Sequence, residues 1–301
     1  MKLLEMQGIC KAFNGIPVLR DARLSVEEGE VHALLGENGA GKSTLMNILT
    51  GSVPLDRGTI TFDGKIVKHV TIRKSEEAGI AFVHQELNLF NDLTVYENIF
   101  LCKEYINRFG RLKKKEMVTE AKELFGRLDV EIDPMALVSD LKTSDKQLLE
   151  IAKALFFDAK LLILDEPTTS LNNDEVEHLF RIVDGLKKDG ISFIFISHKM
   201  PEIFQYADSY TVLRNGEFVG SGRIDETTPE EITRKMVGNS YSANELYEPR
   251  PLGEPALELV NFSGPGFEDI TLTARTGQII GLTGLQGSGS SELLQCIFGV
   301  T

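Results

Sequence analysis

Apolar and polar positions follow two patterns along the chain, one typical of strands and the other typical of helices. The segments 3–13 and 18–26 are rich in strand-forming residues and are separated by a glycine–proline turn. Residues 31–35 predict a short buried strand, and continuous apolar runs at 161–164 and 191–196 predict strands that are buried on both faces. Because such strands occur in parallel sheets covered by helices, the pattern favours an α/β fold.

Helical periodicity and a higher density of charge mark residues 95–157. Further helices are predicted over 174–188 and 229–237. Two short strands surround Asn215 and Gly216, a pair of residues typical of tight hairpins.

The most specific motif is Gly-Glu-Asn-Gly-Ala-Gly-Lys-Ser-Thr at 36–44, between the buried strand 31–35 and a helix that Gly51 can end. Its glycines allow backbone N–H groups to surround an anion, and the helix N-terminus adds partial positive charge. Lys42 supplies a full charge, and Ser43 offers a hydroxyl to Mg²⁺. The motif therefore predicts a loop that binds the phosphates of a nucleoside triphosphate. Its candidate binding residues are Gly36, Glu37, Asn38, Gly39, Ala40, Gly41, Lys42, Ser43 and Thr44.

Composition excludes several classes of protein. Acidic residues outnumber basic ones by 45 to 32, which argues against nucleic acid as a partner. No apolar run is long enough to span a membrane, and the N-terminus lacks the core of a signal peptide. Cys10, Cys102 and Cys296 form no disulfide or metal pattern, which favours a reducing, cytoplasmic location.

Polar side chains follow three of the predicted strands. Asp165 and Glu166 come directly after the buried run 161–164, at the end of the sheet where ligands bind. Asp165 is a candidate ligand of Mg²⁺, and Glu166 is a candidate base for the attacking water. Gln85 and His198 each follow another strand, so we expect Gln85 to contact Mg²⁺ and water and His198 to reach the γ-phosphate.

Each of these side chains also has a structural explanation. A surface glutamine would look the same as Gln85, and an isolated histidine is more often packed or solvated than functional. Phe13 could stack on adenine, although an aromatic residue near a strand end is often part of the core.

In chain order, the elements over 2–240 resemble the ATP-binding domain of ABC transporters. The similarity is strongest to the fused two-domain ATPase subunits of bacterial ribose-, galactose- and xylose-type importers. It rests on the segments FVHQELNLF (82–90), LTVYENIFL (93–101), EIAKAL (150–155), DEPTTSL (165–171), SHKMPEIF (197–204) and VLRNGEFVG (212–220).

This resemblance implies a RecA-like α/β core, an antiparallel β-subdomain and a helical subdomain at about 92–157. It implies MgATP hydrolysis that drives monosaccharide uptake, at the cytoplasmic face of the membrane. The implied partners are transmembrane permease subunits, a sugar-binding protein that acts through the permease, and a second ABC domain or subunit.

The repeated motifs predict the domain organisation. Residues 1–240 are expected to form the nucleotide-binding domain, and the polar, proline-rich segment 241–255 a linker. Residues 256–301 repeat the beginning of the chain and are expected to be a truncated start of a second ABC domain. In the second phosphate loop, Ser290 stands where the first has Lys42.

One segment departs from the family pattern. The signature L-S-G-G-Q, which contacts ATP on the partner domain, reads Leu-Lys-Thr-Ser-Asp over 141–145. Ser144 is a possible N-cap of the following helix, and Asp145 would repel a γ-phosphate. This signature would serve the second phosphate loop, so one of the two composite ATP sites is expected to be degenerate on both sides.

Two other functions stay open at this point. A soluble ABC protein that acts on ribosomes or DNA would have the same core, although residues 238–255 lack the long charged helix typical of that class. A truncated, poorly catalytic fragment would bind nucleotide without appreciable turnover.

Overall fold

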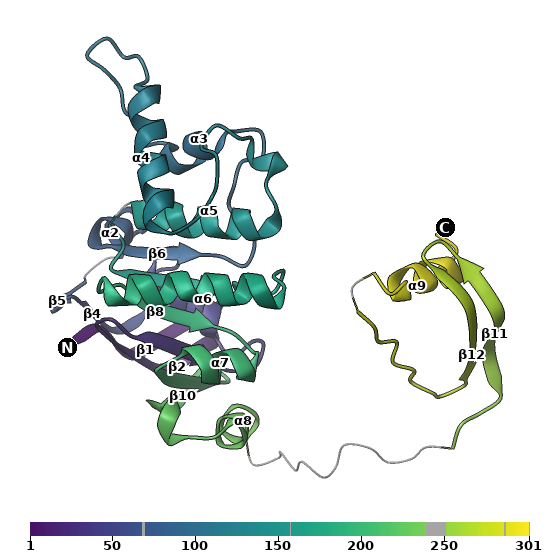
Figure 1. Cartoon of the computed structure of the whole chain (residues 1–301). Coiled ribbons are helices and arrows are strands. Elements are labelled where there is room, and N and C mark those ends of the chain that lie inside the picture. Colours follow the sequence, from purple (N-terminus) through teal and green to yellow (C-terminus); the bar gives the residue numbers. More distant parts are fainter. Residues whose placement is uncertain (68–69, 157, 239–250, 286, 301) are drawn as a thin grey trace. The chain divides into compact units, whose positions relative to one another are not determined.

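The computed structural model describes residues 1–67, 70–156, 158–238, 251–285 and 287–300. The chain forms two compact units, Met1–Tyr241 and Ser242–Thr301 (Figure 1). The predicted domain boundary at residue 240 and the linker residues 241–250 lie outside the described residues.

Unit 1 contains two sheets. The first has the order β10 (Glu217–Arg223), β9 (Ser209–Arg214), β3 (Val31–Leu35), β8 (Ser192–Ile196), β7 (Leu161–Asp165) and β6 (Ile80–Val83). Its strands pair in parallel except for the hairpin β9–β10. The second is antiparallel, in the order β2 (Ile16–Glu27), β1 (Lys2–Phe13), β4 (Arg57–Phe62) and β5 (Lys65–Ile66). The strands predicted from the five apolar segments and the hairpin are confirmed, with ends that shift by at most two residues.

Helix α1 (Lys42–Leu49) is buried between the two sheets. Its Leu45, Met46 and Leu49 are at most 1% exposed. They belong to one core with Leu4 of β1 and Leu34 of β3. This packing explains why so short a helix is stable, since tertiary contacts rather than helix propensity stabilise it. It also holds the preceding phosphate loop in place.

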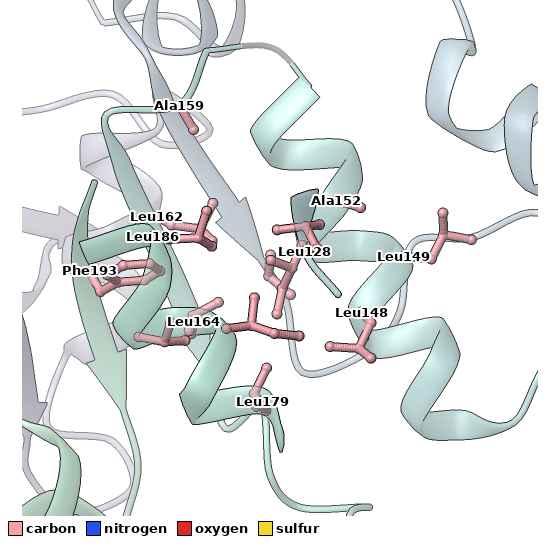
Figure 2. Close-up of a cluster of buried hydrophobic side chains, with 14 of the residues drawn as sticks. Leu128, Leu148, Leu149, Ala152, Ala159, Leu162, Leu164, Leu179, Leu186 and Phe193 are labelled. Atoms are coloured by element: carbon pink, nitrogen blue, oxygen red, sulfur yellow. The ribbon is translucent and has the colours of Figure 1, made fainter. Parts of the chain in front are cut away.

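The opposite face of the parallel sheet packs against a second core, to which α3 (Val95–Phe100), α4 (Lys114–Arg127), α5 (Thr143–Phe156), α6 (Asn173–Lys188), α7 (Met200–Tyr206) and α8 (Pro229–Val237) contribute, with short 3-10 turns at Val138–Asp140 and Ile224–Glu226. Helix α2 (Ile72–Ala78) lies on the side of α1, where its Ala78 packs against the first core. Figure 2 shows Leu162 and Leu164 of β7 facing apolar side chains of the covering helices, among them Leu186 and Leu148. Alternate residues of β7 enter the two cores, which is why its sequence is continuously apolar.

Helices α3, α4 and α5 lie together at one end of unit 1 (Figure 1). They share a core that includes Phe100, Met117, Phe125 and Ile151. In the described part of the chain, no helix has both the length and the apolar character needed to cross a bilayer.

The prediction that Ser144 caps α5 is wrong. Helix α5 begins at Thr143, so Ser144 lies in its first turn. The N–H group of Lys146 donates to the carbonyl of Lys142 at 3.0 Å. Since the N-cap residue is the one whose carbonyl accepts the first helical hydrogen bond, Lys142 occupies that position.

Unit 2 contains the hairpin β11 (Pro255–Gly264) and β12 (Phe267–Arg275), followed by α9 (Ser290–Phe298). These elements repeat β1, β2 and α1 of unit 1. The counterpart of β3 forms no regular strand, and Ile279 within it is 96% exposed. In unit 1, β3 is paired on both sides by β8 and β9, and the described residues of unit 2 contain no such neighbours.

The turn of the β9–β10 hairpin contacts the phosphate loop. Gly216 has φ +80° and donates its N–H to the carbonyl of Ala40 at 3.1 Å, while its own carbonyl accepts the N–H of Arg20 at 2.8 Å. A Cβ at residue 216 would lie 1.9 Å from the carbonyl oxygen of Val18. Glycine is therefore required at position 216, because the φ angle is positive and because the carbonyl of Val18 leaves no room for a Cβ.

We expect Gly216→Ala to lower the free energy of unfolding by about 2–4 kcal/mol, because it adds a backbone collision to an unfavourable φ. Gly64→Ala is the matched control. Gly64 has φ +69°, but no atom lies within 4 Å of an added Cβ, so only the conformational cost of about 1–2 kcal/mol applies. Urea unfolding followed by circular dichroism would measure both changes. Equal losses in the two variants would contradict the close-contact argument.

Candidate functional site

The phosphate loop wraps the N-terminus of α1. Its glycines adopt conformations that other residues rarely reach, with φ +152° at Gly36, +81° at Gly39 and +98° at Gly41. A Cβ at residue 36 would lie 2.3 Å from the carbonyl oxygen of Leu213. No side chain caps the N-terminus of α1 among the described residues, so the N–H groups of its first turn remain available to an anion.

Lys42 lies at the centre of this loop. Its Nζ donates to the carbonyl of Gly36 at 2.7 Å and to that of Glu37 at 3.1 Å. Burial lowers the pKa of Lys42, and the nearby carboxylates of Asp165 and Glu166 act in the opposite direction. The amine is thus tethered to the loop and faces the acidic end of β7, where it can neutralise phosphate charge.

The parallel sheet brings the three predicted catalytic residues together. The Nδ1 atom of His198 lies 3.0 Å from Oε1 of Glu166. On the other side, Nε2 of Gln85 donates to Oε2 of Glu166 at 3.4 Å. These residues follow β8, β7 and β6, which are adjacent strands, so the register of the sheet sets their proximity.

Glu166 is held in an unusual backbone conformation. Its φ is +47°, and its N–H group donates to the carbonyl of Ile196 at 2.9 Å. The hydroxyl of Thr169 donates to Oε2 of Glu166 at 3.3 Å. Sequence reasoning did not single out Thr169, although its place three residues after Glu166 in the turn after β7 was a signal. Glu166 lines a cleft of about 290 Å³ together with Gln85 and Thr169.

The Asp165 carboxylate is half-buried at the end of β7. Burial raises its pKa, and the charge of Glu166 raises it further, whereas His84 and Lys42 act in the opposite direction. His84 was not among the predicted site residues; its position beside Gln85 at the end of β6 was the available signal. The charge of Asp165 is therefore costly in this structure, and a cation would stabilise it.

The predicted Mg²⁺ ligands, Ser43, Gln85 and Asp165, offer the oxygen atoms that Mg²⁺ prefers. Ser43 and Gln85 are exposed. The described residues contain no group of three His, Cys, Asp or Glu side chains that could hold a metal by themselves. The residues thus fit a Mg²⁺ ion that takes its remaining ligands from phosphates and water, as is usual for this metal.

Phe13 lies at the end of β1, before a turn formed by Asn14 and Gly15. Its ring is 43% exposed, so it is not part of the core. The Nζ atom of Lys11 lies 5.4 Å from the ring centroid. The free ring area leaves a surface on which a planar base can stack.

The degenerate signature segment is linked to the start of α6. The N–H of Asn172, and to a smaller extent the hydroxyl of Ser144, lower the pKa of Glu175. Asn172 also caps α6, where Glu175 completes a capping box. The N-terminal end of α5 therefore has carboxylates from Asp145 and Glu175 beside it, which disfavours a phosphate there.

Two glycines of the loop before α9 share the left-handed conformation of their counterparts in the phosphate loop of unit 1. Gly287 and Gly289 have φ +82° and +84°, close to the values at Gly39 and Gly41. The first helical residue is Ser290 in place of lysine. Gln286 of this loop lies outside the described residues. The two glycines before the helix are thus retained, whereas the lysine is not.

Comparison with known proteins gives a consistent result. A family model described as "ABC transporter" matches residues 19–169. The chain is 44% identical over 301 residues to "Ribose import ATP-binding protein RbsA" of Oceanobacillus iheyensis, covering 100% of this chain and 60% of that protein. A protein of the same name from Bacillus cereus is 44% identical over 298 residues, covering 98% of this chain and again 60% of the relative. The chain therefore spans about three fifths of the length of these curated relatives.

Solved structures support the same fold. An ATP-binding cassette of an ABC transporter in its ADP conformation superposes with a TM-score of 0.67 at 28% identity, covering 79% of this chain and 97% of that one. A nucleotide-free cassette gives 0.68 at 27% identity, with coverage of 79% and 96%. The predicted fold class, a phosphate-loop α/β domain with an antiparallel β-subdomain, is confirmed.

Proposed function

The chain belongs to the ABC transporter family, and from this premise we propose that unit 1 binds and hydrolyses ATP to energise the import of a monosaccharide. The observation that carries this proposal is the contact of Glu166 with both His198 and Gln85, next to a complete phosphate loop. The names of the relatives, which concern ribose import, support the choice of a sugar as cargo.

We propose that the triphosphate is bound by residues 36–44, with backbone N–H groups and Lys42 around the phosphates and Phe13 against adenine. A Mg²⁺ ion held by Ser43, Asp165 and Gln85 would neutralise phosphate charge. The tether between Lys42 and the carbonyl groups of the loop supports this role. When phosphate oxygens replace those carbonyls, the amine gains charge-assisted hydrogen bonds.

In the hydrolysis step, Glu166 accepts a proton from the attacking water as the oxygen forms a bond to the γ-phosphorus and the bond to ADP breaks. Gln85 and Thr169 donate to one carboxylate oxygen and leave the second beside His198. His198 then connects Glu166 to the γ-phosphate, so the base is oriented only when its neighbours are in place.

Unit 2 is proposed to be the start of a second ABC domain, with residues 1–240 as the first domain and 241–255 as the linker. Head-to-tail pairing would place the degenerate segment 141–145 opposite the loop before α9. Acidic side chains beside segment 141–145 and the absence of lysine from the loop before α9 support a single working ATP site. That site is the one built from the residues of unit 1.

We propose that the membrane partner is a transmembrane sugar permease, which a sugar-binding protein supplies, and that the chain lies at the cytoplasmic face of the membrane. The Gln85 loop, residues 84–91, is the first part of the segment that joins the end of β6 to α3. It connects the catalytic cleft to the surface of the helical region, so a partner that moves the loop would move Gln85.

The first test is a nucleotide assay on the 301-residue chain. We expect MgATP to bind, as measured by calorimetry, and steady-state hydrolysis to be slow, because the working site needs a signature segment from a second domain. The same chain extended by a complete second domain should turn over much faster. Rapid hydrolysis by the 301 residues alone would contradict the one-site arrangement, and absence of MgATP binding would contradict the proposed function as a whole.

A further inference from the structure

The segment before α4 differs in charge from the rest of the chain. Residues 105–115 carry five basic residues and no acidic one, in a protein with a net charge of −13. The five are Arg108, Arg111, Lys113, Lys114 and Lys115, and all except Lys113 are exposed. Figure 1 shows that the loop of this segment projects beyond the start of α4, away from both sheets of unit 1. We call this loop, residues 105–113, the basic tip.

Hydrogen bonds hold the basic tip in one shape. The N–H group of Asn107 donates to the carbonyl of Arg111 at 2.9 Å. The side-chain oxygen of Asn107 accepts the N–H groups of Phe109 at 2.9 Å and of Arg111 at 3.0 Å. At the base of the tip, the hydroxyl of Tyr105 donates to Oε2 of Glu120 on α4 at 2.8 Å. The tip is therefore a small hairpin, anchored on α4, that presents Phe109 in its turn.

Three large apolar side chains of the basic tip face solvent. Phe109 is 74% exposed, Ile106 is 62% exposed and Leu112 is 58% exposed. Ile106 and Leu112 form an antiparallel bridge, so their side chains leave the same face of the hairpin. The guanidinium carbon of Arg108 lies 4.7 Å from the centroid of the Phe109 ring. The tip thus combines exposed apolar groups with cations at close range.

The contacts within unit 1 do not account for this combination. Lys113 pairs with Glu116 at 2.9 Å, and Nζ of Lys114 lies 5.3 Å from the centroid of the Tyr96 ring. Arg108 and Arg111, in contrast, are exposed beside the apolar side chains. Single exposed apolar residues are common on proteins, but a group of them with a charged rim is typical of an interaction surface.

We propose that the basic tip contacts the membrane surface, with Phe109 between the lipid headgroups and with Arg108 and Arg111 on the phosphates of anionic lipids. This inference goes beyond the proposed function and rests on it only in that the chain lies beside the membrane. Arginine binds a phosphate through paired hydrogen bonds as well as through charge. Aromatic side chains are favoured at the level of the headgroups, where one part of the side chain is apolar and its surroundings are polar.

Charge and shape favour a lipid surface over other anions. The rest of the chain is acidic, so an anionic membrane attracts the basic tip and repels the remainder, which also orients the contact. A nucleic acid is usually bound by basic residues spread along a face or groove, whereas here they are confined to one loop and the first turn of α4. Small anions usually occupy concave sites, and the tip projects from the molecule (Figure 1).

The first measurement is co-sedimentation of the 301-residue chain with vesicles, without nucleotide. The vesicles contain phosphatidylcholine alone or with about 30% phosphatidylglycerol as the anionic lipid. We expect binding to the anionic vesicles only, and added salt should weaken it. Combining Arg108→Ala with Arg111→Ala should weaken binding by about tenfold or more. The matched control combines Arg181→Ala with Arg234→Ala, which removes the same charge from exposed positions on α6 and α8 and should leave binding unchanged.

The second measurement uses the fact that the sequence contains no tryptophan. Phe109→Trp places a single fluorescent reporter in the basic tip, and Ile66→Trp places one at an exposed position on β5. On anionic vesicles, the emission of the Phe109→Trp variant should shift to shorter wavelength and be quenched by brominated lipid, because the indole enters the headgroup region. The emission of the Ile66→Trp variant should not change.

The inference is overturned if the chain does not bind anionic vesicles, or if the double variant of Arg108 and Arg111 binds them as well as its control does. An unchanged emission of the Phe109→Trp variant on vesicles that bind the chain would also overturn it. Equally tight binding of polyglutamate, with no shift in that emission, would indicate an acidic protein as the partner instead of lipid. MgATP binding by the same samples is measured separately by calorimetry, so a failure of the proposed nucleotide function is distinguishable from a failure of the lipid contact.

Discussion

Lys42→Ala is expected to lower the affinity of unit 1 for MgATP by about 100-fold or more, which corresponds to about 2.7 kcal/mol. In the proposed complex, the lysine would contribute a full charge and charge-assisted hydrogen bonds to phosphate oxygens, in a position where the backbone alone offers only partial charges. Its tether to the carbonyls of Gly36 and Glu37 holds the amine in the loop before the nucleotide arrives. The loss should therefore appear in binding itself and not only in turnover.

Calorimetric titration of the 301-residue chain with MgATP measures this effect directly. Lys115→Ala is a matched control, because Lys115 is exposed on α4, away from the phosphate loop. The affinity of the Lys115→Ala variant for MgATP should equal that of the unchanged protein. If Lys42→Ala binds MgATP as well as the control does, residues 36–44 are not the phosphate site.

Glu166→Gln should abolish hydrolysis while leaving MgATP affinity nearly unchanged. Removing a general base lowers the rate by about 10²–10⁴-fold. Glutamine keeps the size of the side chain and one acceptor oxygen, so contacts with Thr169 and Gln85 can persist in part. Since we propose that Lys42 and the loop supply most of the phosphate contacts, we expect binding not to depend on the carboxylate.

This second effect is best measured in the two-domain form of the protein, where turnover is expected to be substantial. A single-turnover assay with radiolabelled ATP separates the chemical step from product release. Glu177→Gln, an exposed change on α6, provides the control. Normal hydrolysis by Glu166→Gln would show that another group accepts the proton.

Much of the fold could be predicted from local patterns. The apolar runs at 161–164 and 191–196 are buried on both faces because each strand contributes alternate residues to two cores. The phosphate loop was recognisable because its glycines occupy positive-φ positions that few other residues tolerate. The order of Gln85, Asp165, Glu166 and His198 along the chain indicated that parallel strand ends would bring them to one edge.

Other features depended on contacts between distant segments. Thr169 and His84 were not predicted, because their proximity to Glu166 and Asp165 follows from the turn after β7 and the pairing of β6 with β7. The cap of α5 was misassigned by two residues, since Lys142 takes the position without a capping side chain.

The sequence by itself determined the α/β class, the phosphate loop and the set of polar residues at strand ends, because these depend on period, residue type and the conformational freedom of glycine. Only the tertiary structure decided that Glu166 contacts His198, that Gly216 packs against Val18 and Ala40, and that the repeat of β3 in unit 2 forms no regular strand. The physical reason is that a hydrogen-bonded strand or a close contact requires partners from elsewhere in the chain, and a local pattern carries no information on whether those partners are present.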